Sequence, residues 1–246
     1  MSGRIIPVLL IKNKGLVKTT GFKNPVYVGD PLNTIKIFNS KKADEIIVLD
    51  IIVTPKKGKP DFTYLSLLAS ECFMPMIYGG GICTLDDASK VFDCGVEKVS
   101  VNTAVYNNFS LISRIANKYG SQSVIVSIDT RITKQGNYFV FTRNGKENTN
   151  IEPRQYALMA QENGAGEILL TSINREGTRS GYDVALINMI ASFVKIPLIA
   201  CGGAKDTDDL KNAMNNGASA AAAGTMFFFT GNHRAVLISY PQNHSF

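Results

Sequence analysis

Short apolar runs alternate along the chain with longer segments that carry helix signals. Continuous apolar runs are typical of strands that are buried on both faces of a parallel sheet. We expect strands at Arg4–Ile11, Glu45–Ile52, Pro75–Gly81, Glu97–Asn102, Val124–Asp129, Glu167–Thr171, Pro197–Gly202 and Ala218–Ala223. Because eight such strands alternate strictly with helices, the pattern predicts an α/β fold, a closed (β/α)8 TIM barrel.

The segments between the strands predict the helices of this barrel. An acid followed by a proline, as at Asp30-Pro31, is typical of a helix start. Further helices are expected at Phe62–Cys72, Leu85–Phe92, Phe109–Lys118, Pro153–Glu162, Val184–Phe193 and Asp206–Asn215. The end of the chain, Gly231–Phe246, leaves room for only a short eighth helix.

Two long connections interrupt the alternation. Asn13–Gly29 is rich in Lys and Gly, and we expect a long loop there, with Lys18 either a phosphate contact or a solvated side chain. Arg131–Asn150 contains YFVFTRNGKENT, which predicts a small hairpin that turns at Asn144-Gly145.

The chain resembles itself at an offset of 122 residues. Asp30–Ile51 then falls on Glu152–Ile173, GGGI at 79–82 falls on CGGA at 201–204, and Thr103 falls on Thr225. Several blocks in one register indicate a half-unit used twice. We therefore expect one barrel domain over residues 1–246, built from half-units of about 1–122 and 123–246.

Composition narrows the chemistry that such a barrel can perform. The net charge of +6 favours anionic ligands, but the charges are spread along the chain, which argues against nucleic acid. No apolar run approaches the roughly 18 residues that span a bilayer, and residues 1–15 lack a signal-peptide pattern, so we expect a cytoplasmic protein without membrane insertion.

The four cysteines, Cys72, Cys83, Cys94 and Cys201, show no CxxC spacing, and the two histidines, His233 and His244, lie near the end. We expect neither a metal site nor a cofactor, and carboxylates, lysines or backbone dipoles must carry the chemistry.

Glycines and threonines gather where the expected strands end. Backbone N–H groups of glycine turns can approach a phosphate closely, and a following helix N-terminus favours the anion. We predict phosphate contacts from Gly80, Gly81, Asn102 and Thr103 in the first half, and from Gly177, Thr178, Gly202, Gly203, Gly224 and Thr225 in the second. Plain tight turns are the alternative for any single pair of glycines, but the duplicated sets favour a substrate with a phosphate at each end.

Carboxylates at the same strand ends are the candidate acid–base groups. Asp129 closes the fifth strand and Asp50 the second, each directly after apolar residues. A buried carboxylate there is better explained by a site than by packing, although a salt bridge to Lys12 or Arg131 would also account for it. The first strand carries Leu10 near the level of Asp129, so one carboxylate of a symmetric pair is absent.

Charged residues also begin four of the strands. Arg4, Glu45, Lys98 and Glu167 stand at matching heights with alternating sign. They predict a salt-bridged ring across the N-terminal end of the barrel, which is either a functional gate or a stabilising plug.

The motifs RIIPVLLIKNKGLVKT, VLDI, GGGI, KVSVNTA, GAGEILLTSINREGTRSGYD, CGGA and AGTMF together resemble the cyclase subunit of imidazole glycerol phosphate synthase, HisF. The resemblance covers essentially the whole chain except its last fifteen or so residues. It implies a half-barrel duplication, two phosphate sites and a HisH-like glutaminase docked on the N-terminal face. It also implies that ammonia from this glutaminase passes the ring of Arg4, Glu45, Lys98 and Glu167, and that the catalytic aspartates end strands one and five.

The chain departs from this family pattern at the site. Asp129 matches the second catalytic position, but Leu10 occupies the first, and Asn174 and Glu176 replace aspartates. With LLIKNKGLVKT, FKNPVYVGDP and ASECFMPMIYGGGI, the chain is similar to a HisF-like branch that serves acetamidino modification of surface-polysaccharide sugars. That branch implies a HisH-like glutaminase, an ATP-dependent amidotransferase and a nucleotide-linked sugar.

Three functions follow from these resemblances. Our leading hypothesis is ammonia delivery for acetamidino formation on a nucleotide-linked sugar in lipopolysaccharide (LPS) biosynthesis. The alternatives are a genuine histidine-pathway cyclase, in which Asp50 or Glu176 replaces the missing aspartate, and a non-catalytic scaffold that activates a glutaminase.

Overall fold

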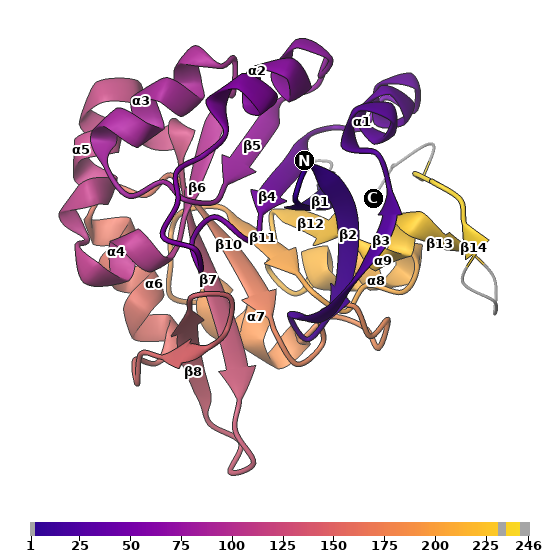
Figure 1. Ribbon diagram of the computed structural model, residues 1–246. Coiled ribbons are helices and arrows are strands. Elements are labelled where there is room, and N and C mark those ends of the chain that lie inside the picture. The colour runs from indigo at the N-terminus through magenta and orange to yellow at the C-terminus, as the bar shows by residue number, and fades with distance from the viewer. Residues whose placement is uncertain (1–2, 231–234, 242–246) are drawn as a thin grey trace.

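The computed structural model describes residues 3–230 and 235–241, and in this part of the chain eight parallel strands close into a barrel (Figure 1). In barrel order the strands are β1 (Arg4–Lys12), β4 (Ile46–Asp50), β5 (Met76–Gly79), β6 (Lys98–Val101), β7 (Val124–Ile132), β10 (Glu167–Ser172), β11 (Leu198–Cys201) and β12 (Ala220–Ala223). Strand β12 pairs with β1 through Arg4↔Ala220 to Pro7↔Ala223, which completes the ring. The predicted (β/α)8 TIM barrel is confirmed.

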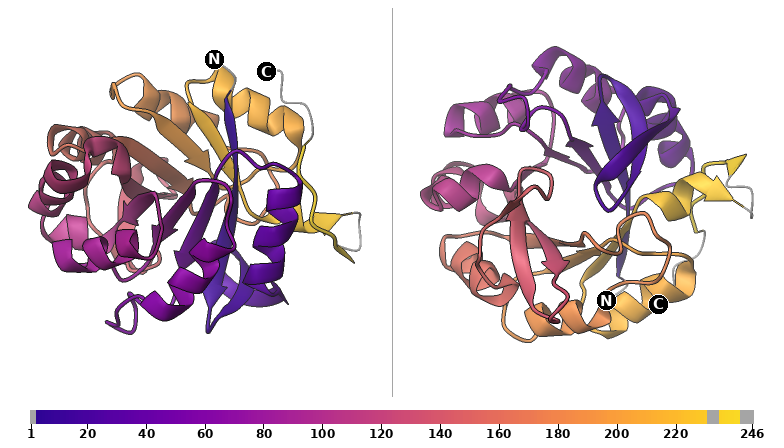
Figure 2. Two further views of the ribbon diagram at one scale, coloured as in Figure 1. Left: turned by 90° about the horizontal axis from the view of Figure 1, so that it is seen from above. Right: turned by 60° about the horizontal axis from the view of Figure 1, so that its bottom comes forward.

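Helices form an outer layer around the strands (Figure 2). They are α1 (Pro31–Ser40), α2 (Phe62–Ser70), α3 (Leu85–Asp93), α5 (Ser110–Tyr119), α6 (Pro153–Glu162), α7 (Val184–Ala191) and α8 (Thr207–Asn215), close to the expected ranges. Short helices α4 (Thr103–Asn107) and α9 (Thr225–Phe228) and the 3₁₀ turn η1 (Ser121–Ser123) were not predicted. No helix among residues 3–230 and 235–241 is long and apolar enough to cross a membrane.

The expectation of a long loop at 13–29 is wrong. These residues form β2 (Gly15–Thr20) and β3 (Lys23–Gly29), which extend β1 as antiparallel strands. Asn13 and Lys14 both have positive φ, as do Gly21 and Phe22. Each pair therefore makes a tight two-residue hairpin turn, but Lys14 and Phe22 stand where glycine usually marks such turns. The hairpin predicted at Asn144-Gly145 is confirmed between β8 (Tyr138–Thr142) and β9 (Glu147–Asn148).

The last expected element lies largely outside the described residues. The short eighth helix fell in 231–246, of which 235–241 are described, and these carry β14 (Ala235–Val236), paired with β13 (Phe229–Thr230). His233 and His244 also lie outside the described residues.

Element boundaries repeat at the offset found in the sequence. Helices α1 and α6, helices α3 and α8, strands β5 and β11, and strands β6 and β12 each begin and end 122 residues apart. Cap contacts repeat as well, because Asp87 accepts from the Cys83 amide and Asp209 from the Lys205 amide. The two halves therefore share one local structure.

Two apolar clusters hold the layers together. The larger fills the space between strands and helices, with Phe38, Tyr156 and Phe227 fully buried in it. The smaller fills the barrel interior and consists of Ile6, Val8, Ile47, Ile77, Ile125, Leu169, Ile199, Ala220 and Ala222, with Leu10, Leu49 and Cys201 packed against it. Inward-facing residues recur at every second position of a strand. This periodicity decides which side chains reach either end of the barrel.

Candidate active site

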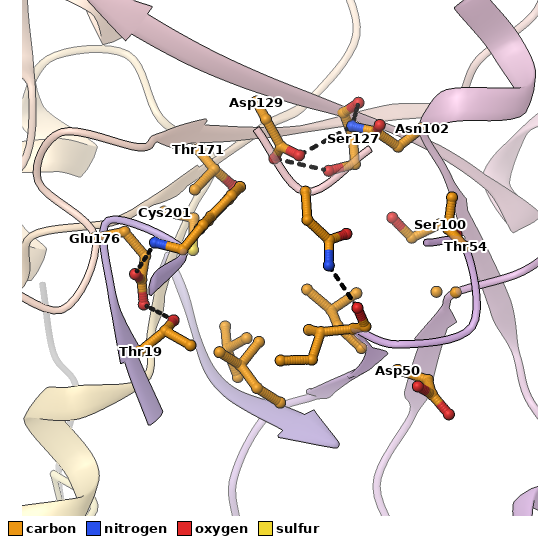
Figure 3. Close-up of a pocket in the computed structure, with 18 of the residues that line it drawn as sticks. Thr19, Asp50, Thr54, Ser100, Asn102, Ser127, Asp129, Thr171, Glu176 and Cys201 are labelled. Atoms are coloured by element: carbon orange, nitrogen blue, oxygen red, sulfur yellow. Dashed lines mark hydrogen bonds between the residues drawn. The ribbon is translucent and has the colours of Figure 1, made fainter. Parts of the chain in front are cut away.

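A cavity of about 360 Å³ opens at the C-terminal ends of the strands. Its walls come from both halves of the barrel, and its floor is the interior cluster at Val8, Leu10 and Leu49. The C-terminal ends of the strands carry the active site in TIM-barrel enzymes. This cavity is therefore the candidate active site, and Figure 3 shows the side chains around it.

Asp129 points into the cavity because it continues the inward series Ile125, Ser127, Asp129 on β7. Its carboxylate accepts from Asn102 Nδ2 at 3.1 Å and from Ser127 Oγ at 3.5 Å (Figure 3). Burial raises the pKa of Asp129 to about 7, against the opposing effect of its hydrogen-bond donors. A carboxyl group that is half-protonated near neutral pH can both accept and donate a proton.

Lys18 is a second charged group at the same site, and it is buried. Its side chain leaves β2, is 4% exposed, and donates from Nζ to the Val8 carbonyl at 2.6 Å. The ammonium also lies 3.9 Å from the centre of the Phe228 ring. Burial lowers the pKa of Lys18 to about 7. Its burial could not be foreseen, because a lysine in a segment expected to be a loop is usually solvated.

Leu10 occupies the place that corresponds to Asp129. Residues paired across neighbouring strands form the series Leu10, Leu49, Gly79, Ser100 in the first half and Asp129, Thr171, Cys201, Ala222 in the second. The last residue of the first series, Ser100, pairs with Ile125, which is four residues before Asp129. In the same way, the last residue of the second series, Ala222, pairs with Ile6, which is four residues before Leu10. The register is thus the same in both halves, and Leu10 is the counterpart of Asp129.

Asp50 lies across the cavity from Asp129, and its carboxylate is turned away from that residue (Figure 3). It follows the inward residue Leu49, so it belongs to the outward series of β4. Its Oδ1 accepts from the Ile52 amide at 3.1 Å, and burial raises its pKa. Asp50 therefore belongs to the rim rather than to the group around Asp129.

The residues predicted to contact phosphate line the cavity, with the exception of Thr178. They are Gly80, Gly81, Asn102, Thr103, Gly177, Gly202, Gly203, Gly224 and Thr225. The Thr178 hydroxyl instead bonds to Arg175 O and Ser180 Oγ, and its neighbour Arg179 lines the cavity.

Gly80 and Gly202 show why glycine is required in these turns. Their φ values are +128° and +93°, and a Cβ atom would lie 2.6 Å from the Asp50 carbonyl oxygen and 2.8 Å from that of Ser172. Only glycine allows the following backbone to run this close to the ends of the neighbouring strands.

Two hairpins cross the mouth of the barrel, one from each half. Glu176 receives hydrogen bonds from the Thr19 hydroxyl at 3.0 Å and the Phe22 amide at 3.1 Å, both from the β2–β3 hairpin. On the other side, the Arg143 amide at the tip of the β8–β9 hairpin donates to Thr103 Oγ1 at 3.1 Å. Each hairpin thus reaches the opposite half, so the two halves build the mouth together.

The opposite end of the barrel carries the predicted ring. Arg4 pairs with Glu45 at 2.6 Å and with Glu167, and Lys98 pairs with Glu45 at 2.6 Å and with Glu167 at 3.3 Å. The two glutamates are nearly buried, with side chains 3% and 6% exposed. The four charges alternate and close a ring, as predicted, whereas its role as a gate stays a prediction.

The notion that the cysteines are small buried hydrophobic residues, the interpretation that the missing CxxC spacing favours, does not hold fully for any of the four. Cys72, Cys94 and Cys201 are half-buried, but Cys83 is exposed at the rim of the cavity. Within residues 3–230 and 235–241, no group of three or more histidines, cysteines and acids could hold a metal ion.

Comparison with known proteins adds to this geometry. The model of a family described as "Histidine biosynthesis protein" matches residues 4–233. The chain is 52% identical over 239 residues to the "Putative imidazole glycerol phosphate synthase subunit hisF2" of Pseudomonas aeruginosa, covering 97% of this chain and 95% of that protein. It is 45% identical over 242 residues to the "Putative imidazole glycerol phosphate synthase subunit HisF" of Leptospira interrogans (97% and 94%). It is 43% identical over 224 residues to the "Imidazole glycerol phosphate synthase subunit HisF" of Sulfolobus acidocaldarius (91% and 89%).

Proposed function

Because the chain belongs to the histidine biosynthesis protein family and is a HisF-type subunit, we propose that it uses ammonia in a glutamine amidotransferase of the imidazole glycerol phosphate synthase type. The observation that carries this proposal is Asp129, a half-buried carboxyl group that lines the cavity between two glycine-rich turns and whose pKa is raised by burial to about 7. The description of the family, "Histidine biosynthesis protein", favours histidine biosynthesis as its pathway.

The substrate would span the mouth with one phosphate at each glycine turn. Backbone N–H groups and helix N-termini favour the phosphate charge at both ends. Asp129 would then transfer protons to and from the reacting centre between them, because its pKa suits both directions near neutral pH. Lys18, whose ammonium can lose its proton near the same pH, would be a second proton-transfer group or a contact for the substrate.

Ammonia would reach this site through the barrel from a HisH-like glutaminase on the N-terminal face. The ring of Arg4, Glu45, Lys98 and Glu167 would be its entrance. Beyond the ring, the interior is lined by aliphatic side chains and by Ala220 and Ala222. An apolar path suits neutral ammonia and rejects the ammonium ion, whose desolvation is costly. This path would keep ammonia unprotonated until it meets the substrate.

Leu10 supports a second candidate function. A cyclase of this type uses an aspartate on strand one, and the counterpart of Asp129 here is a leucine that can neither accept nor donate a proton. The chain would then deliver ammonia to an ATP-dependent amidotransferase, which forms an acetamidino group on a nucleotide-linked sugar in LPS biosynthesis. Ring closure would be lost, but the ammonia route would be kept.

Turnover of the purified protein with ammonium salt and the phosphoribulosyl-formimino carboxamide ribonucleotide tests the first proposal. Free ammonia removes the need for a glutaminase, so only the chemistry of the barrel is measured. We expect turnover with a kcat on the order of 1 s⁻¹ or more. The Asp129→Asn variant should lose about 10³-fold in kcat, while Asp50→Asn, on the outward series, should change it less than about threefold.

The Leu10→Asp variant separates the two candidates. Absence of turnover in the wild type, together with a gain in Leu10→Asp, would reject the cyclase and support ammonia delivery. Absence in both proteins, with glutaminase activation intact when the partner is added, would instead support a non-catalytic scaffold.

A further inference from the structure

Two cationic residues at the rim of the cavity are related by the internal repeat. Lys57 and Arg179 lie 122 residues apart, one after strand β4 and the other after its counterpart β10. Both line the cavity, and both have left-handed backbones, with φ of +53° and +58°. This conformation is unfavourable for side chains other than glycine, and residues that keep it cluster at functional sites. The same left-handed conformation with the same charge therefore occurs at two positions that the repeat makes equivalent.

Arg179 lies beside the glycine turn of the second half. Its Nη2 donates to the Lys205 carbonyl at 3.3 Å, two residues after Gly203. Its Nε is buried and has no hydrogen-bond partner among the described residues. A guanidinium has donors in a planar fork that fits a phosphate. Here Nη2 holds the guanidinium against the turn, and Nε is left without a partner.

Lys57 lies beside the glycine turn of the first half. Its amide donates to the Thr54 carbonyl at 3.0 Å, and the Thr54 hydroxyl accepts from the Gly81 amide at 3.2 Å. Thr54 thus connects the backbone at Lys57 to the glycine turn at Gly81. The Lys57 side chain is exposed and forms no ion pair within the described ranges 3–230 and 235–241. Its ammonium is therefore available to a ligand at the rim.

We propose that Lys57 and Arg179 are the cationic contacts of the two phosphate sites, one for each phosphate of the substrate. This assignment rests on the two-phosphate site of the proposed function and adds side-chain charge to its backbone donors. The planar fork of Arg179 binds the phosphate at Gly203 more tightly than the flexible ammonium of Lys57 binds the phosphate at Gly81. The two ends of the mouth thus differ in their affinity for phosphate.

Glycine substitutions test this assignment without straining the fold. Lys57→Gly and Arg179→Gly each remove a charge, and glycine adopts positive φ freely, so the backbone is kept. Lys42→Gly is the matched control, since Lys42 is exposed, has φ of +54° and does not line the cavity. Inorganic phosphate is titrated while the NMR shifts of the Gly81 and Gly203 amides are followed in the full-length protein.

We expect Arg179→Gly to weaken phosphate binding at Gly203 about tenfold and to leave Gly81 unchanged, as is typical of a lost charged hydrogen bond. Lys57→Gly should weaken binding at Gly81 about threefold and leave Gly203 unchanged, because an exposed ammonium contributes less. Lys42→Gly should change neither site.

Three results would overturn the proposal: unchanged affinity in both test variants, an equal loss in Lys42→Gly, or no phosphate binding at either amide of the wild type. Phosphate binding does not depend on turnover. A protein that binds phosphate as expected but shows no reaction would therefore refute the proposed cyclase and leave this assignment standing.

Discussion

The two ends of the barrel differ in whether their charged side chains form ion pairs. At the N-terminal end, Arg4, Glu45, Lys98 and Glu167 are fully paired with one another. At the C-terminal end, Asp129 receives hydrogen bonds from the neutral groups of Asn102 and Ser127. Lys18 likewise contacts a carbonyl and an aromatic ring, and neither Asp129 nor Lys18 has an ion-pair partner within the described residues.

This difference distinguishes charged residues that stabilise the fold from charged residues that can take part in proton transfer. In the ring each charge has a partner of opposite sign, which offsets the cost of taking it out of water. An unpaired buried charge costs free energy unless its pKa shifts toward neutrality, which is the condition for proton transfer near pH 7. The change from paired to unpaired charge can be followed along strand β6 and the residue after it. Lys98 lies in the ring, Ser100 lines the cavity, and Asn102 donates to Asp129.

The largest expected effect comes from removing the unpaired charge at Asp129. Burial raises the pKa of Asp129 to about 7, so the folded state holds this proton more tightly than the unfolded chain, in which an Asp titrates near 3.9. The favourable contribution is complete below about pH 4 and is lost as the pH rises through 7. This loss is on the order of a few kcal/mol, and Asp129→Asn should abolish it.

Urea denaturation between pH 4 and pH 8 measures this difference. The free energy of unfolding of the wild type should fall relative to that of Asp129→Asn across this range. Other groups titrate equally in both proteins, so only the difference is interpreted. If the free energies of unfolding of both proteins changed with pH in parallel, the Asp129 carboxylate would be stabilised as well in the folded state as in water. Asp129 would then not differ from the paired charges at the N-terminal end.

The sequence predicted the barrel well because its strands are buried on both faces. Such strands leave continuous apolar runs, and the repeat at 122 residues placed the counterparts of each turn. The ring was predictable for a related reason, because a charged residue directly before an apolar run must lie at the start of a strand.

Features that depend on distant contacts could not be predicted in this way. Lys18 is buried because the Phe228 side chain, 210 residues away in the sequence, covers it, and because its ammonium reaches the Val8 carbonyl of the neighbouring strand β1. Helices α4 and α9 are too short to show a period. Thr178 is a predicted phosphate contact because it follows Gly177, whereas the left-handed backbone that brings Arg179 to the cavity has no sequence signal.

The ring at the N-terminal end should produce the next largest effect. Lys98→Ala leaves the nearly buried Glu45 and Glu167 with only Arg4 between them. Breaking a buried pair leaves uncompensated charge, and we expect a loss of about 3 kcal/mol in the free energy of unfolding. Urea denaturation at pH 7 measures it.

Lys90→Ala is the matched control for the ring. Lys90 pairs with Asp86 at 2.8 Å on the surface of α3, with both side chains at least half exposed. Exposed pairs of this kind contribute little, so the loss should stay below about 0.5 kcal/mol. If Lys98→Ala lowered the free energy of unfolding no more than Lys90→Ala does, the ion pairs of the ring would contribute no more than exposed pairs. Ion pairing would then not distinguish the two ends of the barrel.

The smallest effect is expected midway between the ends, at Ser100. Its side chain is 5% exposed, and its hydroxyl has no hydrogen-bond partner among the described residues. A buried hydroxyl without a partner carries a desolvation cost and no compensating bond. Ser100→Ala removes the hydroxyl and changes little volume, so the free energy of unfolding should stay the same or rise by up to about 1 kcal/mol.

Ser127→Ala, which removes a donor to Asp129, is the matched variant and should instead raise the pKa of Asp129 further. A loss of more than about 1 kcal/mol in Ser100→Ala would mean that this hydroxyl has a partner in solution, so that the polar lining of the mouth would extend down the barrel interior toward the ring.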